Sequence, residues 1–186
     1  VHCRDEKLYL LNLEEIRKQS RAQAEEIVIS RRMNSDPAKG IDPEAFVKAF
    51  NANKIVTDYF RVGITARGRQ PWLVFERRED RGHPVTVLRR RNSRYQKALQ
   101  TLDPEKFYIQ FLVWPDSFVI YLEARNIAAE NGLLSGWSPE TRTDEYQAPL
   151  GGPLALGPPP EPKPAPPTPP NPNPQPARPK PVDTID

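Results

Sequence analysis

The sequence has little of the material from which most catalytic and metal-binding sites are built. It holds one cysteine, Cys3, and two histidines, His2 and His83. A single cysteine excludes a disulfide within the chain, and these three side chains form no ligand cluster with metal-site spacing. A Walker-type phosphate loop and a G-x-G-x-x-G signature are also missing. We therefore expect a non-enzymatic protein without a cofactor or a metal.

Long apolar runs are missing as well. The longest runs from Phe107 to Trp114 and is interrupted by Gln110, well short of the ~20 residues that span a bilayer. The sequence begins with Val1 rather than Met, so we expect that a signal peptide, an anchor or another segment preceded it. Any membrane association would depend on a segment that is absent from this chain.

A serine nucleophile is not indicated either. Ser135 follows Gly132 by three positions and precedes Gly136, one place too late for the G-x-S-x-G elbow. Neither His2 nor His83 is placed as a general base for it. We expect Gly132 to end a helix and Ser135 to lie in the strand that follows.

Proline, in contrast, is abundant and unevenly placed. Of the 23 prolines, 16 lie between Pro149 and Pro181, while nearly all aromatic and aliphatic residues precede that stretch. We predict a folded domain over residues 1–147 and a disordered, extended proline-rich tail over residues 148–186. Such a tail serves either as a spacer or as a polyproline ligand for an aromatic groove.

The folded part has the pattern of an α+β domain. We predict a strand over His2–Leu11, a helix over Leu13–Ser30 and a second helix that begins at Asp42-Pro43-Glu44. Strands over Tyr59–Ala66 and Trp72–Arg77 are predicted to form a hairpin.

The second half of the domain is predicted to hold a mixed sheet. A short strand over Val85–Leu88 and a short helix over Asn92–Leu102 are expected first. The apolar run Lys106–Trp114 then predicts a central strand that is buried on both faces. A helix capped by Asp116 or Ser117 and ending near Asn131 follows, and Leu133–Trp137 returns as a parallel strand, so that a C-terminal βαβ unit is packed with helices.

Positive charge is concentrated in the middle of the chain. Residues 67–97 hold 10 basic and 3 acidic residues, whereas residues 98–150 hold 3 basic and 8 acidic ones. The candidate contact residues for an anionic surface or nucleic acid in this stretch are Arg77, Arg78, Arg89, Arg90, Arg91 and Arg94. The alternative is a solvated basic face, or one that pairs with the acidic final third of the same domain.

Two further candidates are Asp116 and Arg125. A helical wheel places Ser117, Tyr121 and Ala124 on the inward face, with Arg125 close beside them. An arginine in that position usually has a polar partner, such as a carboxylate or a carbonyl group at a strand end. Either a structural clamp or a contact for a small anion or a partner is therefore expected where the strand meets the helix.

The residues of this unit also resemble a known pattern. The shared features are an apolar strand followed by Pro115-Asp116-Ser117-Phe118, Tyr121, Ala124-Arg125, Gly132 and Gly136-Trp137, together with the opening His2-Cys3-Arg4 and Leu8-Tyr9-Leu10. They resemble an uncharacterised bacterial envelope-associated domain family and are more distantly similar to the periplasmic domains of ExbD/TolR-type biopolymer transport accessory proteins.

The resemblance implies a non-enzymatic envelope-associated scaffold or transport accessory protein, in the cell envelope or periplasm, with protein partners. The alternative is a basic nucleic-acid-binding module that uses Arg67–Lys97.

Overall fold

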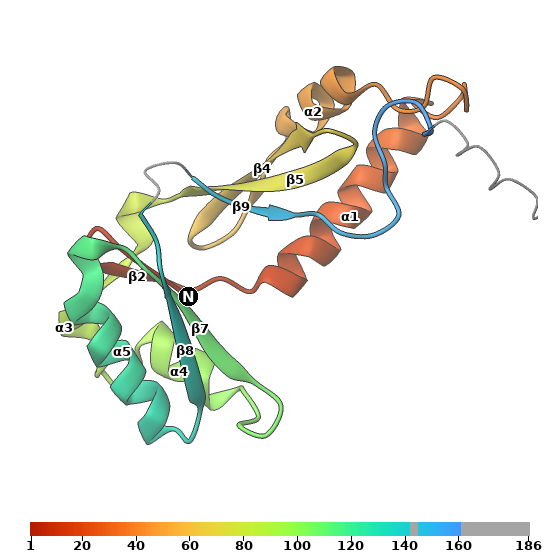
Figure 1. Cartoon of the computed structure of the whole chain (residues 1–186). Coiled ribbons are helices and arrows are strands. Elements are labelled where there is room, and N and C mark those ends of the chain that lie inside the picture. Colours follow the sequence, from red (N-terminus) through yellow and green to blue (C-terminus); the bar gives the residue numbers. More distant parts are fainter. Residues whose placement is uncertain (142–144, 161–186) are drawn as a thin grey trace, which may run out of the picture.

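The computed structural model describes residues 1–141 and 145–160. Two β-sheets, each accompanied by helices, form an α+β fold, as the sequence predicts (Figure 1). In the view of Figure 1, β4, β5 and β9 lie with α1 and α2 in the upper half, and β7 and β8 lie with α3, α4 and α5 in the lower half. Among the described residues, no helix is both long and apolar enough to cross a bilayer.

The four-stranded sheet is antiparallel and runs in the order β3-β4-β5-β9. Its elements are α1 (Leu13–Ser30), α2 (Pro43–Asn51), β3 (Ile55–Val56), β4 (Phe60–Arg67), β5 (Gln70–Arg77) and β9 (Tyr146–Pro149). The predicted cap of α2 is confirmed, because the Asp42 side chain accepts hydrogen bonds from the backbone of Glu44 and Ala45. The predicted β4–β5 hairpin is also confirmed.

The five-stranded sheet is mixed and runs in the order β6-β2-β1-β7-β8. Its strands are β1 (His2–Arg4), β2 (Lys7–Tyr9), β6 (His83–Pro84), β7 (Tyr108–Val113) and β8 (Leu134–Pro139). The accompanying helices are α3 (Val85–Leu88), α4 (Arg94–Gln100) and α5 (Phe118–Glu130), with short 3-10 turns η1 (Glu79–Arg81) and η2 (Pro115–Ser117). Strand β7 pairs with β8 in parallel through the crossover helix α5, which confirms the βαβ unit.

Two sequence predictions of local structure are wrong. The stretch His2–Leu11 is a hairpin of two strands, because Asp5 and Glu6 adopt left-handed φ angles of 53° and 55° and reverse the chain. Val85–Leu88 is one turn of helix after Pro84 rather than a strand. Asp5-Glu6 is not one of the dipeptides that strongly predict a turn, and Val85–Leu88 is too short for apolar periodicity to distinguish a strand from a helix.

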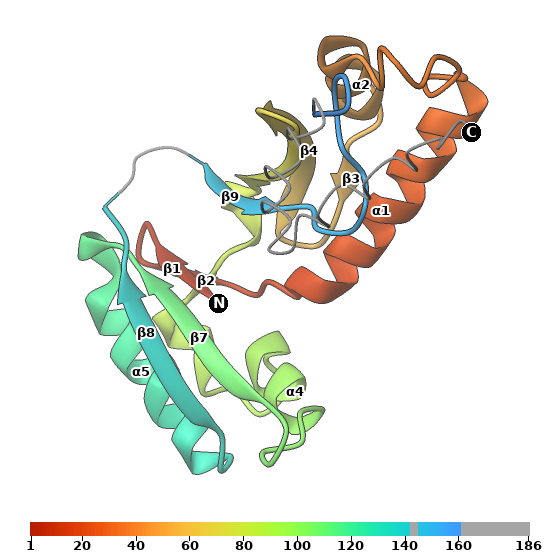
Figure 2. The same cartoon turned by 45° about the vertical axis from the view of Figure 1, so that its right-hand side comes forward.

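The sequence predicted that strand β7 is buried on both faces, but it is buried on only one. Ile109, Phe111 and Val113 face the helices, whereas Tyr108 is exposed on the other face. Figure 2 shows the reason, since α5 lies behind β7 and β8 and no described helix covers their front.

The folded part extends further along the chain than expected. The boundary predicted between residues 147 and 148 falls inside β9, and Leu150 and Leu156 are buried in the core of the four-stranded sheet. Leu156 also forms a β-bridge with Ile41, two residues before α2 begins. The remainder of the predicted tail, residues 161–186, lies outside the described residues.

Candidate functional site

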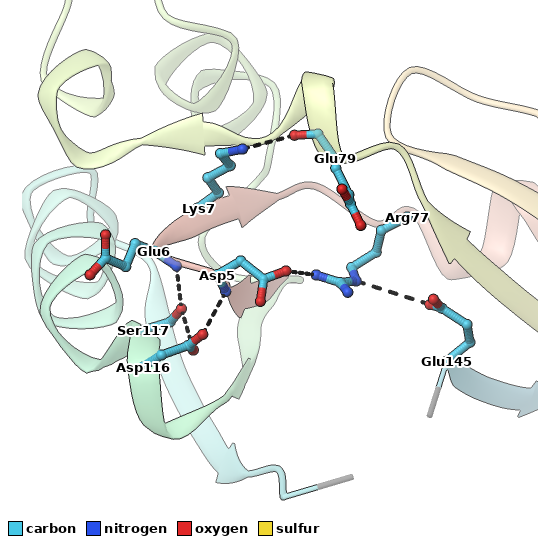
Figure 3. Close-up of polar contacts among 8 residues, drawn as sticks. All are labelled: Asp5, Glu6, Lys7, Arg77, Glu79, Asp116, Ser117 and Glu145. Carbon is cyan, nitrogen blue, oxygen red and sulfur yellow. Dashed lines mark hydrogen bonds and ion pairs between the residues drawn. The ribbon is translucent and has the colours of Figure 1, made fainter. Parts of the chain in front are cut away.

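The predicted candidate Asp116 anchors the β1–β2 turn (Figure 3). The backbone N–H of Asp5 donates to Asp116 Oδ2 at 3.1 Å, and that of Glu6 donates to Ser117 Oγ at 2.9 Å. Ser117 Oγ in turn donates to Asp116 Oδ1 at 2.9 Å. These bonds hold two residues in the left-handed region, which is costly for residues other than glycine. The geometry is that of a structural clamp.

Arg77 joins the two sheets at the same place (Figure 3). It extends from the end of β5, its side chain is only 9 % exposed, and it forms ion pairs with Asp5 and, at 4.0 Å, with Glu145. Its guanidinium also lies 5.9 Å from the ring centroid of Tyr9. Burial opposes the charge, but the bond to Asp5 and the nearby carboxylates outweigh it and raise the pKa of Arg77.

Three more of the predicted arginines have partners within the chain. Arg89 pairs with Glu123 and Glu130 of α5. Arg94 Nη1 lies 2.7 Å from Asp58 Oδ2. Arg78 Nη1 donates to the carbonyl of Thr57 at 2.9 Å. The sequence had left two alternatives open for the basic stretch, and these contacts favour internal pairing, in part with the acidic final third.

The predicted basic cluster is therefore not one surface. Its members are divided among the end of β5, the residues after α3 and the start of α4. Arg90 and Arg91 are exposed, and their side chains form no hydrogen bond or ion pair with any described residue. Of the six arginines that the sequence singled out, only the adjacent Arg90 and Arg91 are left without a partner among the described residues.

Arg125 points outward, which corrects the placement beside the inward face. The buried stripe of α5 consists of Ile120, Tyr121, Ala124, Ile127 and Ala128. Because each residue turns the helix by about 100°, Arg125 lies about that far from Ala124 and is exposed. Within residues 1–141 and 145–160 its side chain has no ion-pair or hydrogen-bond partner.

The sequence did not predict an exposed apolar area that surrounds Arg125. Phe118 and Leu122 of α5 and Trp137 of β8 are 46 %, 39 % and 47 % exposed. The rings of Phe118 and Trp137 contact each other with centroids 6.0 Å apart. We call Phe118, Leu122, Arg125 and Trp137 the α5–β8 surface. Its one signal in the sequence is that apolar residues on α5 extend beyond a single stripe.

The other features of the described structure give weaker evidence for a functional site. A hollow of about 360 Å³ lies between α1 and residues 150–155 and is lined mainly by apolar groups, with Arg21 and Glu25 as its charged residues. Asp116 and Arg125 do not line it. No group of His, Cys, Asp and Glu in the described part of the chain is arranged to hold a metal ion.

Comparison with known proteins gave no match to a family model, to a curated protein or to a solved structure. The resemblance noted in the sequence therefore stays a prediction.

Proposed function

We propose that the chain is a non-enzymatic protein-binding module, of the scaffold or transport-accessory kind, and that it binds through the α5–β8 surface. The observation that carries the proposal is the exposure of Phe118, Leu122 and Trp137 side by side on one part of the molecule. Single exposed apolar residues are ordinary, whereas grouped ones mark interaction sites. Aromatic residues with arginine are also the combination enriched at protein interfaces.

The packing of this surface suits binding. Trp137 contacts both Phe118 and Tyr121, with ring centroids 6.0 and 5.6 Å apart, so its side chain is held in place before any partner arrives. A side chain that is already ordered loses little conformational entropy on binding. Burial of this surface by a partner should therefore be opposed by only a small loss of side-chain entropy.

The location in the cell envelope belongs to the same proposal and is supported by the sequence resemblance. The nucleic-acid alternative has less support, because Arg77, Arg78, Arg89 and Arg94 make contacts inside the protein. These contacts already use part of the donor capacity of the four guanidinium groups, and the carboxylate partners of Arg77, Arg89 and Arg94 offset the positive charge that would attract a phosphate.

Photo-crosslinking tests the proposal. With p-benzoylphenylalanine in place of Leu122, in the full-length protein in its own cells, we expect a covalent adduct with another protein chain. The matched control places the same residue at Ile29, which is 72 % exposed on α1. Trp137→Ser should weaken binding of the identified partner, measured with purified components, by tenfold or more. No adduct from position 122, or equal adducts from both positions, would refute the proposal.

An oligonucleotide titration addresses the alternative. We expect no micromolar binding at physiological salt, and no difference between the wild type and the triple variant R89A/R90A/R91A. If the basic stretch were a nucleic-acid surface, about five phosphate contacts would give a log–log salt slope near −4 to −5. Such a slope, reduced in the triple variant without a change in melting temperature, would favour the nucleic-acid function.

A further inference from the structure

Strand β8 has an unpaired edge among the described residues. It is the last strand of the five-stranded sheet and pairs there with β7. The N–H of Glu140 donates to the carbonyl of Val113 at 2.9 Å, so Ser138, Gly136 and Leu134 also direct their backbone groups toward β7. Ser135 and Trp137 consequently direct their N–H and C=O groups away from the sheet.

This edge lacks the usual protection against pairing. Edge strands commonly carry charged side chains, an inserted bulge or a central proline. Leu134–Pro139 holds no charged residue, and its proline is at the end. Four backbone groups, two from Ser135 and two from Trp137, are thus available to another strand.

The same two residues lie at the α5–β8 surface, of which Trp137 is a member. Phe111 pairs with Trp137 and Ile109 pairs with Ser135, which places both side chains on the face that α5 covers. Helix α5 runs opposite to β8 (Figure 2). One helical turn past Tyr121 covers about 6 Å, close to the length of two strand residues. Because Tyr121 contacts Trp137, this geometry is expected to place Arg125 near Ser135.

We propose that the partner of this surface is a second copy of the chain, joined by antiparallel pairing of β8 with β8. The pairing is centred on Gly136, so that Ser135 of each copy lies opposite Trp137 of the other. This register uses all the outward backbone groups of Ser135 and Trp137 and forms four hydrogen bonds across the two-fold axis. It deepens the proposed function and rests on it.

The register also pairs the cation of each copy with an aromatic ring of the other. In this register the cationic Arg125 of each copy reaches the electron-rich ring of Trp137 in the other, a favourable cation–π pair. The positive charges of the two copies are offset along the strands, since each lies above Ser135 rather than at the axis. Phe118 and Leu122, on the side of α5 toward the β8 edge, would be covered by α5 of the second copy.

Gly136 provides the sharpest test. At the two-fold axis it would face its own copy in a non-hydrogen-bonded pair, whose Cα atoms lie about 4.5 Å apart, within the range of a disulfide. A cysteine there is accommodated, because the added Cβ would meet only the end of the Gln110 side chain at 3.2 Å. The native Cys3 is buried and does not interfere.

We expect Gly136→Cys to form a covalent dimer under mild oxidation, seen on a non-reducing gel. Ser138→Cys is the matched control, because its counterpart in the second copy lies four residues along the strand, roughly 13 Å away, beyond the reach of a disulfide. Ser135→Pro should raise the dimer dissociation constant at least tenfold in sedimentation analysis, with an unchanged fold, since its N–H faces outward.

A monomeric wild type at high micromolar concentration, or equal crosslinking of Gly136→Cys and Ser138→Cys, would overturn the dimer. If position 122 then crosslinks to a different protein, the proposed function stands and the second copy is the part that fails. An adduct of twice the chain mass from position 122 supports both.

Discussion

Replacing Phe111 with alanine should lower the free energy of unfolding by about 3 to 5 kcal/mol. Phe111 is fully buried in β7, the strand that lies between β1 and β8. Its ring packs edge to face on Tyr121 of α5, with centroids 5.4 Å apart. The substitution removes this contact and leaves a cavity between the sheet and the helix. Urea denaturation followed by tryptophan fluorescence measures the change.

Tyr108→Ala is the matched control, because Tyr108 lies on the same strand and is 66 % exposed on the other face. We expect its effect to stay below about 1 kcal/mol, as is usual for surface substitutions. If Phe111→Ala cost no more than this control, β7 would be peripheral and the sheet order would be wrong.

Much of the fold could be predicted from local sequence signals. Asp42-Pro43-Glu44 specifies a helix start by a side-chain acceptor, a fixed φ angle and a favourable charge, and α2 begins there. The β4–β5 hairpin follows from alternating apolar residues around Gly68, whose φ of 58° suits the turn. The β7–α5–β8 unit follows from an apolar run, Pro115 and Gly132.

Other parts depend on contacts between distant residues and could not be predicted this way. Asp5 and Glu6 carry no turn signal as strong as Asn-Gly, and their conformation is supported by Asp116 and Ser117, 111 positions away. Strand β9 has a weak strand pattern that ends in Pro149, and it forms by pairing with β5. Tertiary pairing overrides local propensity in such segments.

The candidate site likewise has residues that the sequence could identify and features that depend on the tertiary structure. The sequence identified Asp116 and Arg125 as notable, and the structure makes Asp116 a clamp for the turn and leaves Arg125 exposed. Phe118 and Trp137 belong to the predicted βαβ unit, but their exposure depends on β8 being the outer strand. Composition and periodicity do not specify which strand ends a sheet.

His2 should make the protein sensitive to mild acid. Its ring is buried between the two sheets, with the rings of Phe60, Trp114 and Tyr146 at centroid distances of 5.3, 5.7 and 4.8 Å. Nε2 has no hydrogen-bond partner among the described residues. Burial holds the pKa of His2 well below 6.5, and the positive charges of the Val1 amino group, Arg77 and Arg4 lower it further.

A histidine with a lowered pKa destabilises the native state as the pH falls. Below about pH 6.5 the unfolded chain takes up a proton at this residue, and the native protein, with its lower pKa, does not. The unfolded state then binds more protons, so stability decreases with decreasing pH. Each pH unit contributes at most 1.36 kcal/mol for one proton, so His2 alone accounts for a loss of no more than about 2 kcal/mol between pH 6.5 and pH 5.

We therefore expect the unfolding free energy of the wild type to fall more steeply over this pH range than that of His2→Leu, with a difference of at most about 2 kcal/mol. Leucine suits a site lined by aromatic rings and takes up no proton. Burial and Arg94 also lower the pKa of His83, and burial lowers the pKa of the Val1 amino group to about 6. Both groups are present in both proteins, so the difference between the two curves reports on the His2 side chain. Urea denaturation at pH 7.5, 6.5, 5.8 and 5.0 measures both curves. Parallel curves would show that His2 is protonated in the native state, with a partner for Nε2 that the described residues do not supply.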